Sequence, residues 1–188
     1  VTVTLISAPC VTSGSSPAFL IILTVEKSSP FSVLNKSNSG CSPFGKTMLT
    51  EVENFPVINA VKAALVAAVA HENLGHKAII VTANSASLAP SEFNELLKIA
   101  RQSNFNHRVI YTKEVEKPEY KVNTPQRCYF CKEELYTELK KLALNEEIPW
   151  IANGTNVDDL GDFRPGIKAS KDFMIRSPLV ESGINKKE

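Results

Sequence analysis

The chain has 188 residues, of which 43 % are apolar and 22 % are charged, and this composition excludes a wholly disordered protein and predicts a globular domain. The net charge of +1 excludes an extended basic surface, so we expect no binding to a nucleic acid backbone. Because the four cysteines are too few for a secreted disulfide scaffold and no signal peptide is convincing, we expect a cytoplasmic protein.

Residues 1–50 are rich in Ser, Thr, Pro and Gly and lack helical periodicity, which predicts an extension of uncertain order. Their one concentrated apolar run is AFLIILTV at 18–25. A membrane span needs roughly twenty apolar residues, so this shorter run is interpreted as a strand or a buried loop. We therefore expect no membrane association.

Helix and strand signals alternate from residue 51 to residue 188, which predicts an α/β domain with a Rossmann-like, doubly wound parallel sheet. We expect Gly75 to end the first helix and Ser91 to cap the second. The predicted helices are 58–75, 91–103 and 131–144, and the predicted strands are 77–83 and 107–112, with a third strand that runs into a glycine-containing loop within 149–156.

A Cys-x-x-Cys pair, Cys128 and Cys131, stands where the third helix begins. At a helix start, unpaired backbone N–H groups and the helix dipole favour thiolate, and Arg127 and Lys132 act in the same direction. Thiolates bind metals, exchange disulfides and transfer sulfur. The spacing therefore leaves four interpretations open: a metal site, a redox pair, a sulfur-handling site, and two ordinary residues at a helix start. For zinc, the remaining cysteines and histidines show no ligand spacing.

Two loops after predicted strands carry small polar residues. The segment NGTNVDDLGDFRPG, 153–166, follows the last predicted strand, where ligands bind in open α/β sheets. Gly154 permits close backbone approach, and Asp158 with Asp159 could hold Mg²⁺ on nucleotide phosphates. A polar turn with solvated carboxylates is the alternative. In VTANSASL, 81–88, Asn84 and Ser85 could line the same pocket, or form a plain connecting loop.

These segments together resemble the LarE family of ATP-dependent sulfur transferases over about residues 57–188. The specific blocks are RCYFCK around the cysteine pair and DDLGDFRPG in the later loop. The family belongs to the PP-loop ATP pyrophosphatases, related to NAD and GMP synthetases. The resemblance implies that ATP adenylylates a carboxylate of a pyridinium biscarboxylate mononucleotide, and that sulfur is then inserted on the way to a nickel-pincer cofactor. It also implies a homo-oligomer.

The resemblance assigns roles to individual residues. Cys128 and Cys131 are expected to be sulfur-handling thiolates or ligands of an iron–sulfur cluster, and Arg164 is expected to bind the phosphate or carboxylates of the substrate. Asp158 and Asp159 are expected to hold Mg²⁺. The residues expected near the ATP phosphates are Asn84, Ser85, Gly154, Thr155, Asn156, Asp158 and Asp159.

The chain departs from the family pattern in two places. The phosphate loop of the family reads Ser-Gly-Gly-x-Asp-Ser, and here INAVKAA, 58–64, stands in its place with no glycine cradle, so we expect weak or no ATP hydrolysis. The family also continues into a third cysteine and a smaller C-terminal domain. We therefore interpret 51–188 as a partial PP-loop-type domain, from a fragment or a degenerate copy. The alternative is a non-catalytic nucleotide- or metal-binding protein of the same fold.

Overall fold

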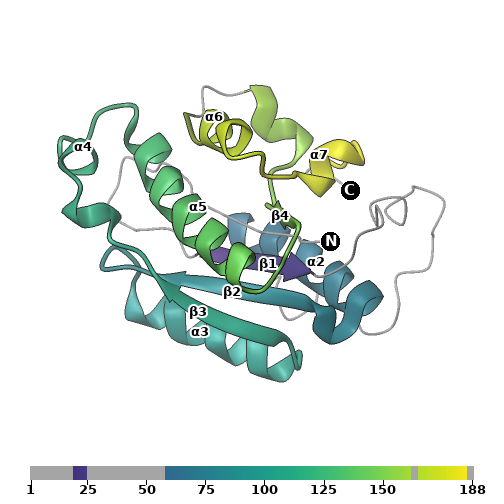
Figure 1. The fold of residues 1–188 in the computed structure, drawn as a ribbon. Helices are drawn as coiled ribbons and strands as arrows, with labels where there is room; N and C mark the ends of the chain where they lie inside the picture. The colour runs from purple at the N-terminus through teal and green to yellow at the C-terminus, as the bar shows by residue number, and fades with distance from the viewer. Residues whose placement is uncertain (1–18, 25–57, 162–164, 186–188) are drawn as a thin grey trace.

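A four-stranded sheet lies at the centre of the fold with helices on both of its faces (Figure 1). The computed structural model describes residues 19–24, 58–161 and 165–185, of which 19–24 and 58–61 are described by their backbone alone. The strands are β1 (Phe19–Thr24), β2 (Ala78–Asn84), β3 (Asn106–Tyr111) and β4 (Trp150–Ala152). The longer helices are α2 (Ile58–Leu74), α3 (Pro90–Gln102), α5 (Arg127–Asn145) and α6 (Pro165–Asp172). The short helical segments are η2 (Gly75–Lys77), η3 (Glu114–Glu116), α4 (Pro118–Lys121), η4 (Val157–Gly161) and α7 (Pro178–Glu181). No helix among the described residues is long and apolar enough to cross a membrane.

The middle of the sheet is buried on both faces because β2 is apolar on both sides. Ala78 and Ile80 pack into a cluster with residues of α2 and α3, whereas Ile79, Val81 and Ala83 pack into a second cluster with residues of α5. Successive side chains of a strand point to opposite faces, so one continuous apolar run supplies both clusters. The α/β class expected from the sequence is confirmed.

The direction of β1 departs from the expected parallel sheet. The sheet has the order β3-β2-β1-β4, and β2 pairs with β3 in parallel. β1 pairs antiparallel with both β2 and β4, so the sheet is mixed, whereas β2, β3 and β4, which lie in the part of the chain where the parallel sheet was expected, all run in one direction. An apolar run fits a buried strand in either direction, which is why the sequence left its orientation undetermined. The domain boundary predicted near residue 50 lies outside the described residues.

Of the two helix caps predicted from the sequence, one is confirmed and one is wrong. α2 ends at Leu74, and Gly75 follows with a φ of 57°, the left-handed conformation that the predicted cap requires. The cap predicted at Ser91 is wrong, because α3 begins at Pro90 after Ala89, which makes no side-chain cap. The ring of proline already holds the φ angle of a first helical residue, so the helix starts without a serine cap.

The burial of His107 on β3 is expected to make the stability of the protein depend on pH. Its Nε2 lies 2.9 Å from the Thr82 hydroxyl, and burial, with a smaller contribution from Arg108, lowers the pKa of His107 from 6.5 to about 4. Because the folded state disfavours the charged imidazole, this residue contributes stability above about pH 6.5 that is lost as the pH falls toward 4. We expect a loss of about 1 to 3 kcal/mol over this range.

Urea unfolding of the wild type and of His107→Gln at pH 7 and pH 4.5 measures this contribution. The variant is expected to lose less free energy of unfolding between the two pH values than the wild type. Because His71 also has a lowered pKa, only the difference between the two proteins is assigned to His107. Equal losses in both proteins would contradict the prediction.

Candidate functional site

The loops after β2, β3 and β4 leave the sheet at one edge. β2 and β3 are parallel, and β1 runs against both β2 and β4, so the three strands β2, β3 and β4 point the same way. The loops after β2 and β3 are joined directly, because the Thr112 N–H donates to the Asn84 carbonyl at 3.1 Å. The predicted nucleotide-binding residues after β2 and after β4 therefore lie at the same edge of the sheet, where open α/β sheets bind ligands.

The loop after β2 contains a buried hydrogen-bond network. The hydroxyls of Ser85 and Ser87 lie 2.7 Å apart, and Ser87 donates to Oε1 of Glu114 at 2.7 Å. Glu114 belongs to η3 and is only 1 % exposed, and its other oxygen, Oε2, has no hydrogen-bond partner among the described residues. Ser85 is thus held within the protein, whereas Asn84 is only half-buried. A ligand at this edge would meet Asn84 more readily than the Ser85 hydroxyl.

The two cysteines differ in their surroundings. Cys131 is 9 % exposed and packs with Tyr120 and Leu135, whereas Cys128 is half-buried. Burial raises the pKa of the Cys131 thiol far above its usual range, and Glu114 and Cys128 raise it further. The expectation that both cysteines favour thiolate is therefore wrong for Cys131, because desolvation outweighs the helix start and the nearby cations.

The basic residues beside the cysteines are engaged in packing. Arg127 donates to the Tyr120 hydroxyl at 2.6 Å and to Asn123 at 3.1 Å, and its guanidinium lies 4.2 Å from the centre of the Tyr120 ring. Lys132 is buried at 8 % exposure and crosses Gly166 of α6 so closely that a Cβ there would lie 2.7 Å from the lysine Cδ. Gly166 therefore leaves room for the lysine stem between α5 and α6.

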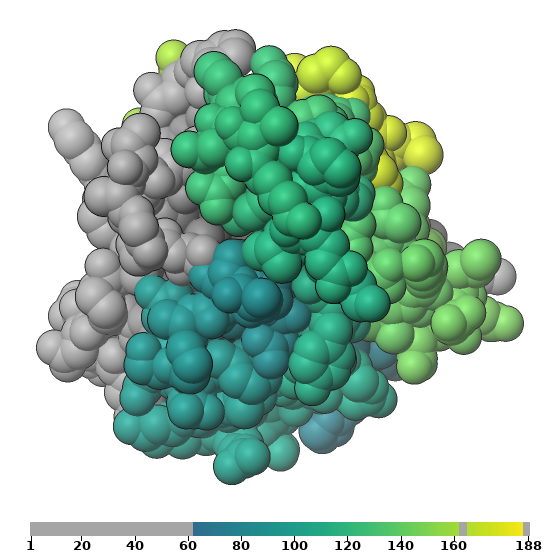
Figure 2. Space-filling view, turned by 90° about the vertical axis from the view of Figure 1, so that its left-hand side faces the viewer, coloured from purple at the N-terminus to yellow at the C-terminus, as the bar shows by residue number. Residues whose placement is uncertain are grey.

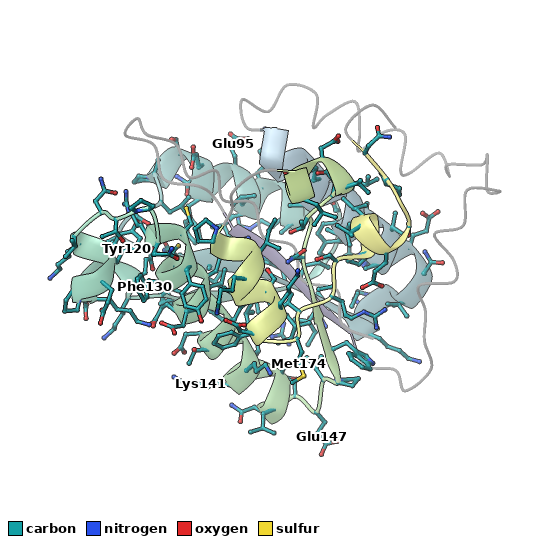
Figure 3. The ribbon with its side chains drawn as sticks, turned by 90° about the horizontal axis from the view of Figure 1, so that it is seen from above. Glu95, Tyr120, Phe130, Lys141, Glu147 and Met174 are labelled. Carbon is teal, nitrogen blue, oxygen red and sulfur yellow. The ribbon has the colours of Figure 1, made fainter. Side chains whose placement is uncertain are left out.

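The start of α5 is covered by aromatic residues. Figure 3 shows Tyr120 and Phe130 near one another at this end, with Lys141 and Glu147 at the far end of α5. Figure 2 views the molecule from the side of α4, where the segment from η3 to the start of α5 covers the middle of the face.

The loop after β4 is organised by Asn153, which is fully buried. Its Nδ2 donates to Ser170 at 3.1 Å and to the Tyr136 hydroxyl at 3.4 Å. Its Oδ1 accepts from the Thr155 N–H at 3.0 Å and from the Ser177 hydroxyl at 2.8 Å. One side chain thus joins the loop to α5, to α6 and to the residue before α7. This arrangement buries the predicted residues Gly154, Thr155 and Asn156.

The two adjacent aspartates of this loop have different environments. Asp158 is exposed, and its Oδ2 accepts from the Asn156 side chain at 3.4 Å. Asp159 is buried at 4 % exposure, and its Oδ2 lies 2.6 Å from Nζ of Lys62 near the start of α2. Helix α2, which stands where the glycine loop of the family was expected, therefore contacts the predicted metal-binding loop directly. Arg164 lies outside the described residues.

The described side chains can be compared with the ligands that an iron–sulfur cluster or a Mg²⁺ ion needs. Among the described residues, no group of three or more His, Cys, Asp and Glu side chains is placed to hold a metal ion. Cys10 and Cys41 lie outside that part of the chain. Cys128 and Cys131 alone supply two of the four thiolates that iron–sulfur clusters usually take from the protein. Asp158, exposed to water, fits a hydrated Mg²⁺ better than Asp159 does.

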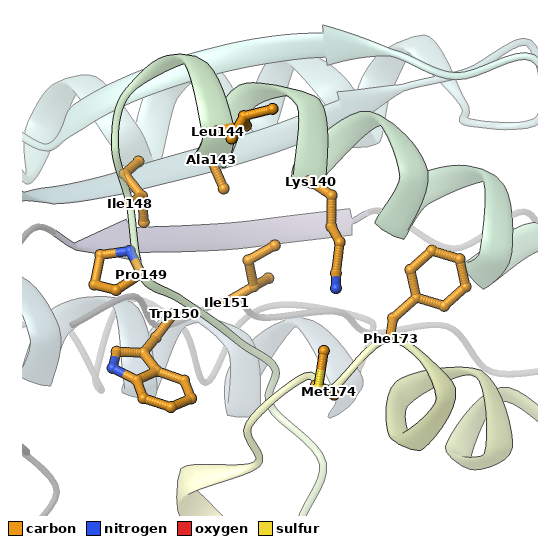
Figure 4. A pocket seen from close by; sticks show the side chains of 9 residues that line it. All are labelled: Lys140, Ala143, Leu144, Ile148, Pro149, Trp150, Ile151, Phe173 and Met174. Atoms are coloured by element: carbon orange, nitrogen blue, oxygen red, sulfur yellow. The ribbon is translucent and has the colours of Figure 1, made fainter.

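A cavity of about 250 Å³ opens at the other end of α5 (Figure 4). Its lining is mostly apolar, and it contains none of the predicted site residues. The residues that line it are Lys140, Ala143, Leu144, Ile148, Pro149, Trp150, Ile151, Phe173 and Met174. Because β4 begins here and the predicted loop follows its other end, the cavity is separate from the candidate site.

Sequence reasoning missed several residues of the site, namely Ser87, Glu114 and Asn153. Glu114 lies in the charged segment KEVEK, which is typical of a solvated surface, so no local signal indicated its burial. Asn153 did carry a signal, because a polar residue that ends a buried strand must find internal hydrogen-bond partners.

No model of a known protein family matches the chain. Two similar relatives are uncharacterized proteins. One, from Synechocystis, is 43 % identical over 128 residues, which are 68 % of this chain and 48 % of that protein. The other, from Methanocaldococcus jannaschii, is 35 % identical over 95 residues, which are 50 % of this chain and 36 % of that protein.

A third relative has a named activity. It is the pyridinium-3,5-bisthiocarboxylic acid mononucleotide synthase of Lactiplantibacillus plantarum, which is 29 % identical over 106 residues, 56 % of this chain and 38 % of that protein. The chain spans less than half the length of each of these three relatives. The likeness to the synthase supports a distant relation of this chain to LarE-like proteins.

Proposed function

We propose that this chain is the nucleotide-binding part of an ATP-dependent sulfur transferase that acts on a pyridinium biscarboxylate mononucleotide. The observation that carries the proposal is the likeness to the synthase of Lactiplantibacillus plantarum. The cysteine pair at the start of α5 and the polar loops at the carboxyl edge of the sheet agree with such a site. In the proposed reaction a substrate carboxylate attacks the α-phosphorus of ATP, and pyrophosphate leaves.

The residues of the site can take distinct parts in this reaction. The polar groups of Asn84, Thr155 and Asn156 would line the nucleotide, with Asp158 available to a hydrated Mg²⁺ that accompanies the polyphosphate. Cys128, the more accessible of the two thiols, would be the sulfur-handling residue, because nucleophilic sulfur must be able to reach the acyl-adenylate carbonyl. Cys131 would pack behind it. The Cys128 thiolate would attack the acyl carbonyl with AMP as the leaving group, and β-elimination at Cys128 would then break its Cβ–Sγ bond, which releases the thiocarboxylate and leaves dehydroalanine.

A second candidate function is a nucleotide-binding protein of the same fold without turnover. The observation that favours it is the start of α2, where INAVKAA forms helix and Ala63 and Ala64 are buried. A glycine loop closes backbone N–H groups around pyrophosphate, and this segment offers no equivalent cradle. The two candidates share the fold and differ in whether AMP is released.

Isothermal titration with ATP and Mg²⁺, followed by chromatographic detection of AMP with the pyridinium substrate present, distinguishes them. Binding with AMP release supports the transferase, and binding without AMP release supports the second candidate. If ATP does not bind, both proposals are wrong. In an active protein, Cys128→Ser is expected to retain pyrophosphate release, which precedes the sulfur step, and to lose both AMP release and the thiolated product, whereas the surface variant Asn94→Ala is expected to retain all three.

A further inference from the structure

The cavity at the far end of α5 is bordered by apolar side chains that remain in contact with water. Leu144 of α5 is 80 % exposed, Met174 after α6 is 73 % exposed, and Trp150 of β4 is 40 % exposed. One exposed apolar side chain is ordinary on a protein surface, but several around one hollow are typical of a binding site. Figure 4 shows that these side chains come from three separate elements that meet at the cavity.

Met174 is held in a backbone conformation that disfavours a side chain. Its φ is 55°, in the left-handed region, and its N–H closes the turn after α6 by donating to the Lys171 carbonyl at 3.0 Å. Glycine is the usual residue at such a helix end, because it adopts this φ without strain. A methionine here both strains the turn and exposes an apolar side chain. These costs are understandable if the thioether serves as a wall of the cavity, where it can contact an aromatic ring.

The charge of the lining favours an anion. Among the described residues that line the cavity, Lys140 alone is charged, and its Nζ lies 5.9 Å from the centre of the Phe173 ring. No carboxylate of the described residues forms an ion pair with Lys140. The Ala143 carbonyl, in the last turn of α5, accepts from the Ile148 N–H at 2.7 Å and is not directed at a ligand. A ligand with one negative charge therefore complements this lining.

The size and the walls of the cavity restrict the ligand further. Its volume of about 250 Å³ lies just below the range of roughly 300–1,000 Å³ that is usual for sites of drug-sized ligands. A molecule of one or two rings fits such a volume. Trp150 and Phe173 provide aromatic walls, and aromatic rings pack favourably against one another in stacked or edge-to-face arrangements.

We propose that this cavity is a binding site for a small planar aromatic carboxylate, whose ring lies against Trp150 and Met174 and whose carboxylate meets Lys140. β4 begins at this cavity, and the loop of the candidate nucleotide site follows its other end. The inference therefore goes beyond the proposed function. Its test uses no nucleotide, so its outcome is independent of whether the chain binds ATP.

NMR titration of the full chain, labelled with ¹⁵N, tests the proposal. The probes are naphthalene-2-carboxylate and its neutral counterpart, naphthalene-2-carboxamide. Trp150 is the only tryptophan of the chain, so its indole N–H gives one signal that reports on the cavity. We expect a saturable shift of this signal with naphthalene-2-carboxylate. The absence of such a shift would overturn the proposal.

Two lysine variants test the recognition of the charge. Lys140→Met keeps the length of the side chain, and it is expected to lower the preference for the carboxylate over the carboxamide about threefold. Lys141→Met is the matched control, because Lys141 lies outside the lining and pairs with Glu138 at 2.6 Å. It is expected to leave the preference unchanged. A preference that is the same in Lys140→Met and in the wild type would overturn the proposal.

Met174→Gly separates a role in binding from a role in stability. It is expected to weaken the binding of both probes at least about threefold, because the ring loses an apolar wall. Its urea midpoint is expected not to fall, because relief of the left-handed φ offsets the greater freedom of glycine in the unfolded chain. Unchanged affinity for the probes, or a lower midpoint without a change in affinity, would overturn the proposal.

Sedimentation velocity tests the alternative that a second copy of the chain covers the cavity. Leu144→Ser removes an exposed apolar side chain from the rim, and it is expected to sediment as the wild type does. A wild-type oligomer that Leu144→Ser dissociates would assign the cavity to contact between copies and would overturn the proposal.

Discussion

Replacing Asn153 with alanine is expected to lower the free energy of unfolding by about 3 kcal/mol, because several buried hydrogen-bonding groups lose their partner together. The Asn153 side chain accepts from the Thr155 N–H and the Ser177 hydroxyl, and it donates to Ser170 and to Tyr136. Within the described part of the chain, the Thr155 N–H has no hydrogen-bond acceptor other than Asn153, so it would remain buried without one. Equilibrium urea unfolding, followed by circular dichroism, measures the loss.

Two control variants distinguish the loss of this hydrogen-bond network from the general effect of removing a side chain. Asn94→Ala, on the exposed side of α3, is expected to change stability by no more than about 0.5 kcal/mol. Asn153→Asp keeps the size of the side chain but replaces the Nδ2 donor by a buried charge, so it is expected to destabilise at least as much as alanine. A loss below about 1 kcal/mol for both Asn153 variants would contradict the role of this residue as the organiser of the loop.

Cys128 is expected to react with iodoacetamide at pH 8 at least about tenfold faster than Cys131, because the thiolate is the nucleophile and burial disfavours it at Cys131. Peptide mapping by mass spectrometry follows each of the four cysteines separately. Addition of urea is expected to remove most of the difference, since unfolding exposes both thiols equally.

The single cysteine variants provide the controls for this experiment. Cys131→Ser is expected to leave the labelling rate of Cys128 within about threefold, and Cys128→Ser is expected to leave Cys131 slow in the folded protein. Equal labelling of the two cysteines in the folded wild type would show that Cys131 is accessible and ionised. That result would contradict the prediction that Cys128 is reactive and Cys131 is protected by packing.

The sequence predicted most of the secondary structure because the apolar period reports which side of an element is buried. Leu135 and Leu139 fall on one stripe of α5, and both are buried. The start of the same helix was placed at Cys131, whereas α5 begins at Arg127. No side-chain cap precedes Arg127 and no acidic residue lies in the first turn, so the sequence carried no clear signal for the start of this helix.

The candidate site was predicted less completely than the fold. The motifs located the cysteine pair and the two loops, and the structure places both loops at one edge of the sheet. They did not reveal that Lys62 would meet Asp159 or that Glu114 would be buried behind Ser87. Each of these contacts joins segments that are far apart in the chain, and a spacing rule within one segment carries no information about them.

By itself, the sequence determined the α/β class, the positions of the main helices and strands, and the residue types available for chemistry. These properties depend on local backbone preference and on periodic burial, which a short window of residues already contains. Only the tertiary structure decided the direction of β1, the unequal burial of Cys128 and Cys131, and the partner of Asp159. The physical reason is that strand pairing, desolvation and charge pairing depend on which distant groups share one interior, and the cost of a buried charge or thiolate is set by those neighbours.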